Sequence, residues 1–312
     1  MLLFRKLQDH FKKPLERFVN SRIDSPIVPM RKMMNTQFCI EQSRKINALS
    51  CMKVSRLVKV HFVFRMGAQN AGDDACCPYQ YFSDLFSAYH CYFHTIPDVD
   101  YACIQKGDIV ICGGGGLIDL FPDWNACVER LYEITGNVII WGAGLNSEKR
   151  EGKIIRSLNL SNMSLVGLRD FGLPFDFVPC PSCMLPELSY SYPKYREIGI
   201  VQHVAYPIDD LSYERITNNV DIYTMLNFIG TSAVIVTNSY HAIYWATLMG
   251  KKVIIYNTFS TKFDNIRWKH PLYSGNLSED ILKCDVYKDV LNDCRMRNYA
   301  FAKKVKTYID GM

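Results

Sequence analysis

From residue 57 onwards, short apolar runs rich in valine and isoleucine alternate with longer segments whose apolar residues recur at helical spacing. The short runs predict buried strands, and the longer segments predict helices. We expect strands at residues 57–65, 91–96, 109–112, 137–141, 165–168, 197–203, 233–237 and 252–256. We expect helices at residues 78–89, 124–134, 221–228, 239–249 and 285–309. This alternation predicts an α/β protein with parallel sheets.

A proline-rich zone divides this pattern into two halves. Its prolines are Pro174, Pro179, Pro181, Pro186 and Pro193. We therefore expect two Rossmann-like domains, at residues 56–165 and 166–312, with a helix closing the second. The 312 residues suit two domains of ordinary size.

Residues 1–55 form a basic extension in front of these domains. Residues 1–60 contain 13 Lys and Arg against 4 Asp and Glu, although the whole chain has a net charge of only +5. Apolar residues in segment 1–20 recur at helical intervals among the basic ones, which predicts an amphipathic helix. That helix could lie on an anionic membrane surface or pack on the body of the protein.

Cysteine usage and hydropathy suggest a compartment. The 12 cysteines form no regular framework, so we expect free thiols in a reducing cytoplasm, with membrane contact at the inner face through residues 1–20. We find neither a secretory signal nor an apolar run of the roughly 18 residues that a membrane span needs. The pair Cys180 and Cys183 lacks a second ligand pair, so we expect no metal. No aromatic-basic motif predicts a nucleic-acid partner.

A strand followed by four glycines is the central feature of the first half. The buried run 109–112 leads directly into Gly113, Gly114, Gly115 and Gly116. Glycines permit positive φ and let the backbone approach a ligand closely, and open α/β sheets bind ligands where strands end. The spacing matches neither a dinucleotide-binding loop nor a P-loop. A binding loop and a plain flexible turn both stay open as interpretations.

A strand-to-helix junction is the main candidate in the second half. The strand at 233–237 leads into Asn238 and Ser239, either of which could cap the next helix, and His241 falls in its first turn. The free N–H groups of a helix N-terminus favour a phosphate or carboxylate. A histidine there can donate a proton or hold an anion, although a purely structural histidine is the alternative.

Further polar residues follow other predicted strand ends. Asn70, Gly72 and Asp73 follow the first strand, and Asp73 could bind a sugar hydroxyl, act as a base or cap a helix. Arg169 could bind a carboxylate or phosphate in a bidentate way, or form an interdomain salt bridge. Lys262 could reach the same cleft, although a solvated loop lysine is the commoner case.

Five short motifs, spread over residues 57–265, together resemble the polysaccharide pyruvyl transferase family. Each motif alone is a weak indicator of the family, but all five in this order are a specific one. They are Asn70-Ala-Gly-Asp73, Gly107-Asp-Ile-Val-Ile-Cys-Gly-Gly-Gly-Gly116, Trp141-Gly-Ala-Gly144, Val166-Gly-Leu-Arg-Asp170 and Thr237-Asn-Ser-Tyr-His241.

This resemblance implies a GT-B-like pair of domains facing a cleft, and an enzyme that uses phosphoenolpyruvate as co-substrate without a bound cofactor. The acceptor would be a sugar of a glycan or lipid-linked oligosaccharide, which receives a pyruvate ketal while phosphate is released. His241 matches the family's histidine, and Arg169 and Asp73 complete the expected catalytic set. The expected substrate-binding residues are Asn70, Gly72, Gly113, Gly114, Gly115, Gly116, Asn238, Ser239 and Lys262.

The sequence departs from the family at two points. Many members have an arginine where this chain has Ser239, and Asp-Pro where it has Cys180-Pro181. Two other functions therefore stay open: a GT-B glycosyltransferase using a nucleotide sugar, and a non-catalytic glycan-assembly protein. The residues themselves fit pyruvyl transfer, because addition to an enol ether needs a proton donor and a cradle for phosphate and carboxylate.

Overall fold

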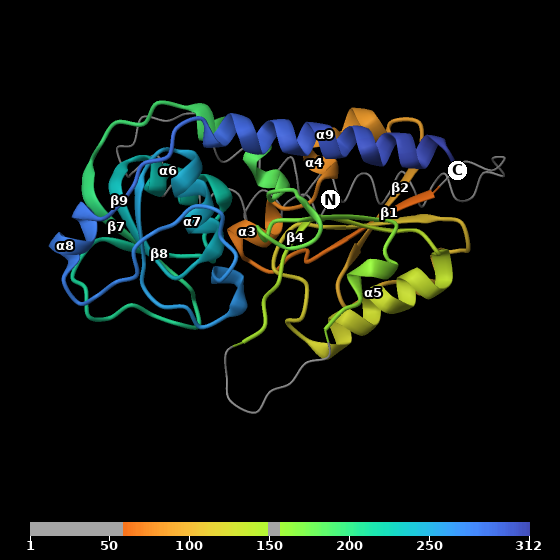
Figure 1. Cartoon of the computed structure of the whole chain (residues 1–312), viewed down its shortest axis with the longest axis horizontal. Helices are drawn as coiled ribbons and strands as arrows, with labels where there is room; N and C mark the ends of the chain where they lie inside the picture. The colour runs from red at the N-terminus through yellow and green to blue at the C-terminus, as the bar shows by residue number, and fades with distance from the viewer. Residues whose placement is uncertain (1–58, 149–156) are drawn as a thin grey trace, which may run out of the picture.

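The computed structural model describes residues 59–148 and 157–312, which form a mixed α/β structure with two parallel sheets (Figure 1). The basic extension of residues 1–55, with the amphipathic helix expected at residues 1–20, lies outside the described residues. Each strand pairing in both sheets is parallel, as the alternation of strands and helices predicts.

The first sheet has six strands in the order β2-β1-β3-β4-β5-β6. Its strands are β1 (Lys59–Phe64), β2 (His90–Thr95), β3 (Ile109–Gly113), β4 (Val138–Ala143), β5 (Leu165–Leu168) and β6 (Asp176–Phe177). The central strands β3 and β4 are buried throughout, which explains their unbroken apolar sequences.

The second sheet has four strands in the order β10-β9-β7-β8. Its strands are β7 (Arg196–Gln202), β8 (Arg215–Thr217), β9 (Ser232–Thr237) and β10 (Lys252–Ile255). The sequence predicted the three longer strands, whereas β6 and β8 are two and three residues long and too short for a periodic signal.

The helices begin and end at recognisable signals. They are α3 (Ala71–Asp74), α4 (Tyr79–Phe82), α5 (Pro122–Thr135), α6 (Ile222–Gly230), α7 (Tyr240–Leu248), α8 (Leu277–Leu282) and α9 (Val290–Asp310). Helix α5 begins with Pro122 and is followed by Gly136 at φ 72°, the expected residues for these positions. Asp221 caps α6 by accepting hydrogen bonds from Tyr223 and Thr224 backbone N–H groups.

The prediction of one helix over residues 78–89 is wrong. This segment contains α4, which has four residues, followed by a 3₁₀ turn at Ser83–Phe86. Phe82 leaves the helical region at φ −126° and ψ 27°. The polar residues that follow, Ser83 and Asp84, favour turns over helix interiors.

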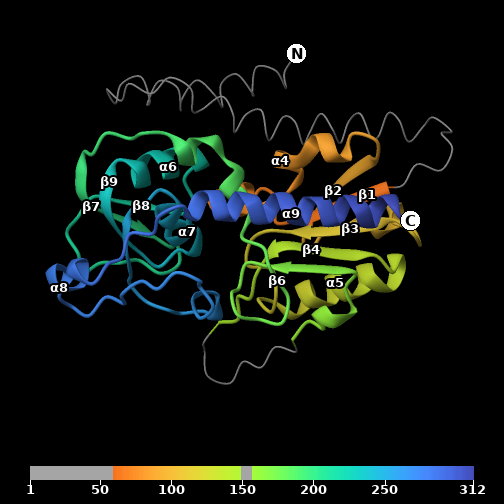
Figure 2. The same ribbon diagram turned by 45° about the horizontal axis from the view of Figure 1, so that its top comes forward.

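The first sheet extends beyond the boundary expected between residues 165 and 166. Strand β5 begins at that boundary and pairs with β4, and β6 pairs with β5 in turn. Helix α9, expected to close the second domain, crosses from the second sheet to the first (Figures 1 and 2). On the first sheet, Trp141 donates a hydrogen bond to Asn298 (3.0 Å) and packs edge-on against Phe301. Helix α9 therefore fastens the two sheets together.

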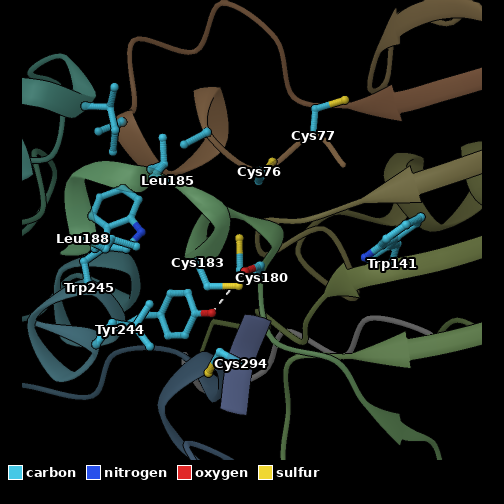
Figure 3. Packing of buried hydrophobic residues seen from close by; sticks show 14 of the residues in the cluster. Cys76, Cys77, Trp141, Cys180, Cys183, Leu185, Leu188, Tyr244, Trp245 and Cys294 are labelled. Atoms are coloured by element: carbon cyan, nitrogen blue, oxygen red, sulfur yellow. Dashed lines mark hydrogen bonds between the residues drawn. The ribbon is translucent and has the colours of Figure 1, made fainter. Parts of the chain in front are cut away.

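The core between the sheets contains Cys180 and Cys183, both buried free thiols (Figure 3). The Tyr244 hydroxyl donates a hydrogen bond to the Cys180 carbonyl at 3.1 Å. Asn298 donates to the Cys183 sulfur at 3.3 Å. Burial raises the pKa of both thiols, which suits packing rather than thiolate chemistry.

Candidate functional site

A cavity of about 330 Å³ collects polar side chains from both sheets. Its walls come from segments that follow the carboxyl ends of strands in both sheets, namely β1, β3, β4 and β5 in the first and β7, β8, β9 and β10 in the second, where parallel sheets usually bind ligands. Seven of the predicted site residues line it: Asn70, Asp73, Gly116, Arg169, Ser239, His241 and Lys262. The structure therefore brings these seven residues to one cavity, whereas Gly72, Gly113, Gly114, Gly115 and Asn238 do not line it.

Asp73 contributes the acidic group on the wall nearest the first sheet. Asn70 caps the short helix α3 by accepting the Gly72 N–H at 3.1 Å, so Asp73 is not the cap. Desolvation by burial raises the pKa of Asp73 to about 6, and Arg65, 3.4 Å away, opposes this shift. Asp73 is therefore an acid–base group that titrates close to neutral pH.

Arg169 is a buried cation, and within residues 59–148 and 157–312 no carboxylate forms an ion pair with it. It follows β5 and is 3% exposed, and its Nε and Nη1 atoms have no hydrogen-bond partner among the described residues. Its guanidinium lies 3.7 Å from the centre of the Tyr240 ring. A β-carbon on Gly144 would lie 2.4 Å from Nε, so this glycine makes room for the arginine. The interdomain salt bridge considered from the sequence is not formed within the described residues.

His241 is the second residue of α7 and lines the cavity at the helix N-terminus. Desolvation by burial, reinforced by Arg169 and Lys262, lowers its pKa well below the usual value. The imidazole is consequently neutral in this state, and its Nε2 atom is buried without a partner among the described residues. The ring stacks on Trp245 at 5.2 Å between centroids, so it contributes to packing as well as to the cavity wall.

Lys262 is buried in the cavity wall, so the solvated lysine that the sequence favoured is wrong. It lies in a 3₁₀ turn at Thr261–Phe263, with Nζ 4.2 Å from the centre of the Phe259 ring. Desolvation and the neighbouring Arg169 lower the pKa of Lys262 to about 7. A bound anion would offset both effects and restore its charge.

The glycine loop acts differently from the sequence expectation. Of its four glycines, Gly116 lines the cavity, and the other three make room for protein atoms. A β-carbon would lie 2.4 Å from Pro78 at Gly113, 2.2 Å from Cys76 at Gly114 and 3.3 Å from Asp73 at Gly115. Most of the loop therefore lets the segment after α3 pack closely and hold Asp73 in place.

Asn238 and Ser239 have separate roles. The Asn238 side chain accepts the His203 N–H (2.7 Å) and donates to the Tyr206 carbonyl (2.8 Å), so it orders a loop that lines the cavity. Ser239 occupies the N-cap position of α7, but its side chain makes no capping hydrogen bond. Neither residue caps the helix, and Ser239 remains in the cavity wall beside the free helix N-terminus.

Several cavity residues were missed from the sequence. The polar ones are Arg65, Asn146, Glu148, His203, Tyr206, Asn218, Tyr240 and Ser260, and the aromatic ones are Phe121, Trp124 and Phe259. His203 directly follows strand β7, so the strand-end rule could have found it. Desolvation, with Lys262 and Arg65 nearby, lowers the pKa of His203 to about 4. The aromatic residues lie in loops and a helix start, where sequence pattern gives no signal.

These features define an α/β protein whose two parallel sheets contribute to one polar cavity that contains Arg65, Arg169 and Lys262. The polysaccharide pyruvyl transferase family model matches residues 60–258 of the 312. The chain belongs to the polysaccharide pyruvyl transferase family, whose name denotes a transferase and a glycan acceptor.

Other comparisons add little to this assignment. A solved structure of a functionally uncharacterized protein from Klebsiella pneumoniae subsp. pneumoniae NTUH-K2044 is similar at 16% identity and a TM-score of 0.46, covering 75% of this chain and 92% of that one. No curated protein matches the chain. In residues 59–148 and 157–312, no helix combines the length and the apolar character needed to cross a bilayer.

Proposed function

We propose that this protein transfers a pyruvyl group from phosphoenolpyruvate to two hydroxyls of a sugar in a cell-surface or exopolysaccharide glycan. The observation that carries this proposal is the set of buried nitrogens of Arg169 and His241, two residues of one cavity, that find no partner in the part of the chain that the structure describes. Buried polar groups without partners are costly, and they are commonly retained to meet a ligand. Phosphoenolpyruvate carries two anionic groups that can accept hydrogen bonds from them.

The donor's charges also determine the protonation of the site. Without a bound anion beside them, Lys262 has a pKa of about 7 and His241 a pKa well below its usual value. A phosphate and a carboxylate beside these groups raise both pKa values, so the donor binds together with protons. Arg169 offers charged guanidinium N–H donors for one of the anionic groups. His241 then becomes an acid next to the methylene of the donor.

The reaction adds one hydroxyl of the sugar to C2 of the donor. His241 gives a proton to the methylene carbon, a bond forms between the hydroxyl oxygen and C2, and Asp73 takes the hydroxyl proton. The bond between C2 and the phosphate oxygen then breaks, and a second sugar hydroxyl forms the second ketal bond. Its proton leaves with the phosphate, which balances the reaction. Asp73, with a pKa of about 6, is largely ionised at neutral pH and suits the role of base.

The aromatic side of the cavity suits the acceptor sugar. The rings of Tyr206 and Phe259 stack at 3.9 Å between centroids, and both residues line the cavity. Flat aromatic surfaces bind the apolar faces of sugar rings, while polar groups select their hydroxyls. Asn146 and Ser260, joined by a hydrogen bond of 2.6 Å, provide polar groups on the same wall. In this proposal the two sheets act as a GT-B-like pair, and the enzyme works in the cytoplasm.

An acceptor panel tests the proposed function. The purified chain is mixed with phosphoenolpyruvate and free or lipid-linked galactose, mannose and N-acetylhexosamine glycans, and inorganic phosphate is measured. Acceptor-dependent phosphate release supports pyruvyl transfer. Release of a nucleotide from nucleotide sugars, with phosphoenolpyruvate unused, identifies a glycosyltransferase instead. Turnover of neither donor, combined with glycan binding, identifies a non-catalytic assembly protein.

A further inference from the structure

A second polar cluster lies within the first sheet, outside the cavity. It consists of His61 on β1, His94 on β2 and Cys103 in a 3₁₀ turn at Tyr101–Cys103. Both histidines are buried, and Cys103 is half-buried. None of the three lines the cavity described above. Their ligand atoms, the Nδ1 of His61, the Nε2 of His94 and the Cys103 sulfur, converge on one point.

The separations within this cluster match those of a tetrahedral zinc site. The distance from His61 Nδ1 to His94 Nε2 is 3.0 Å, and that from Cys103 Sγ to His94 Nε2 is 4.0 Å. Zinc bonds of about 2.0–2.1 Å to nitrogen and 2.3 Å to sulfur, at tetrahedral angles, require about 3.4 Å and 3.5 Å between these atoms. These two separations are within about half an ångström of the required values, and all three ligand atoms lie within 4.8 Å of one another, so small side-chain rotations suffice.

Asp108 supplies the outer hydrogen bond that ligating histidines usually have. Its Oδ2 accepts the Gln105 backbone N–H at 2.8 Å and lies 3.2 Å from Nε2 of His61. Because this oxygen accepts, Nε2 of His61 donates to it, and the Nδ1 of that neutral ring presents a lone pair. A carboxylate behind a histidine fixes the tautomer and strengthens the histidine as a ligand. The arrangement of Asp108, His61 and the central point therefore has the form of a carboxylate–histidine–metal triad.

We propose that His61, His94 and Cys103 bind a zinc ion, with Asp108 orienting His61 from behind. Two nitrogens and one thiolate favour a borderline-soft divalent cation over magnesium or calcium. The half-exposed Cys103 leaves the fourth position accessible to water.

The protons displaced on binding and the positions of the ligands in the sheet define the role of this ion. Binding releases one proton from the Cys103 thiol, and the proton on Nε2 of His94 moves to Nδ1 of the same ring. The ion would join edge strand β2 and the loop containing Cys103 to the adjacent strand β1. It serves as a structural clamp, independent of the proposed transferase reaction. The sequence predicted no metal because the Cys180 and Cys183 pair lacks a second ligand pair, whereas His61, His94 and Cys103 are not close together in the sequence.

Cobalt(II) spectroscopy of the full-length chain tests this proposal. Tetrahedral cobalt bound by a thiolate gives intense visible bands and a sulfur-to-cobalt charge-transfer band in the near ultraviolet. We expect one equivalent of cobalt to produce both, and zinc to remove both by displacing it. Cys103→Ser should abolish the charge-transfer band, and Asp108→Asn should weaken cobalt affinity about 10- to 100-fold. Cys284→Ser, which changes a thiol elsewhere in the chain, is the matched control and should retain the spectrum.

Thermal unfolding provides a second readout. Added zinc should raise the melting temperature of the wild type and of Cys284→Ser, but not that of Cys103→Ser. Absence of tetrahedral cobalt bands in the wild type overturns the proposal, as does an unchanged charge-transfer band in a folded Cys103→Ser variant. Either result identifies the cluster as a metal-free hydrogen-bonded network.

Discussion

Gly72 and His241, which lie 169 positions apart in the sequence, are in such close contact that no residue larger than glycine fits at position 72. A β-carbon built on Gly72 would lie 1.9 Å from Nδ1 of His241. The helix α3, next to the first sheet, therefore presses against the imidazole at the start of α7. This contact fixes the ring in the cavity and explains the glycine in the Asn70-Ala-Gly-Asp73 motif.

Gly72→Ala should displace the His241 ring. We expect turnover to fall by about 10-fold or more, because a displaced acid loses alignment with the donor. Phosphate release measured beside the melting temperature tests this. Gly311→Ala is the control, since its β-carbon would meet no atom closer than 3.4 Å. Unchanged turnover in a folded Gly72→Ala variant would show that the position of the ring is not critical.

His241 itself should be essential for turnover. We expect His241→Gln to keep the packing on Trp245 but lose about 10²-fold or more in turnover, because the amide cannot protonate the donor. His241→Ala should lose turnover and also melt earlier, since the ring is buried against Trp245. Near-normal phosphate release by a stable His241→Gln variant would remove the residue from the mechanism.

Lys262 should lower the free energy of unfolding of the protein when no phosphoenolpyruvate is bound. Its pKa is about 7 in the folded chain against 10.5 for an exposed lysine, so the unfolded chain binds the extra proton between these pH values. Stability should therefore rise with pH across this window. We expect Lys262→Met to add about 2 kcal/mol to the free energy of unfolding at pH 6, a gain that shrinks towards pH 10.

Denaturant unfolding at pH 6 and pH 10 checks this prediction, with Lys269→Met in the same loop region as control. A gain of equal size at both pH values would contradict a depressed lysine pKa. The variant should also bind phosphoenolpyruvate more weakly, as expected when a functional residue is retained at a cost in stability.

The pH dependence of kcat/KM reports the free enzyme. Asp73 must be ionised to act as base, which occurs above its pKa of about 6. Lys262 must be protonated to hold the donor, which occurs below its pKa of about 7. We expect a bell whose acidic limb comes from Asp73 and whose basic limb comes from Lys262 together with His241, the proton donor, whose lowered pKa moves that limb to lower pH. Asp73→Asn should lower turnover about 10²-fold and abolish the acidic limb of the profile. If the acidic limb persists in that variant, a group other than Asp73 causes it.

The sequence predicted the long strands and the strand-end residues well, for a physical reason. Arg169 and His241 follow buried apolar runs, and parallel strands that end at one edge bring such residues together. The sequence could not decide whether Lys262 lies in the cavity or in solvent. Its burial depends on Phe259 and Phe263, which pack around it only in the folded chain. The course of α9 was unpredictable for the same reason: its contacts with Trp141 join residues far apart in the sequence.

Titration of phosphoenolpyruvate by calorimetry tests the central claim most directly. Arg169→Met removes the nitrogens that have no partner among the described residues, and Arg297→Met, at a half-buried arginine of α9 that pairs with Asp293 outside the cavity, serves as control. The account predicts that the wild type and Arg297→Met bind phosphoenolpyruvate, that inorganic phosphate competes, and that Arg169→Met weakens binding by about 10²-fold or more, since charged hydrogen bonds contribute about 1.5–3 kcal/mol each. Equal binding by wild type and Arg169→Met, or binding of a nucleotide sugar with none of phosphoenolpyruvate, would contradict it.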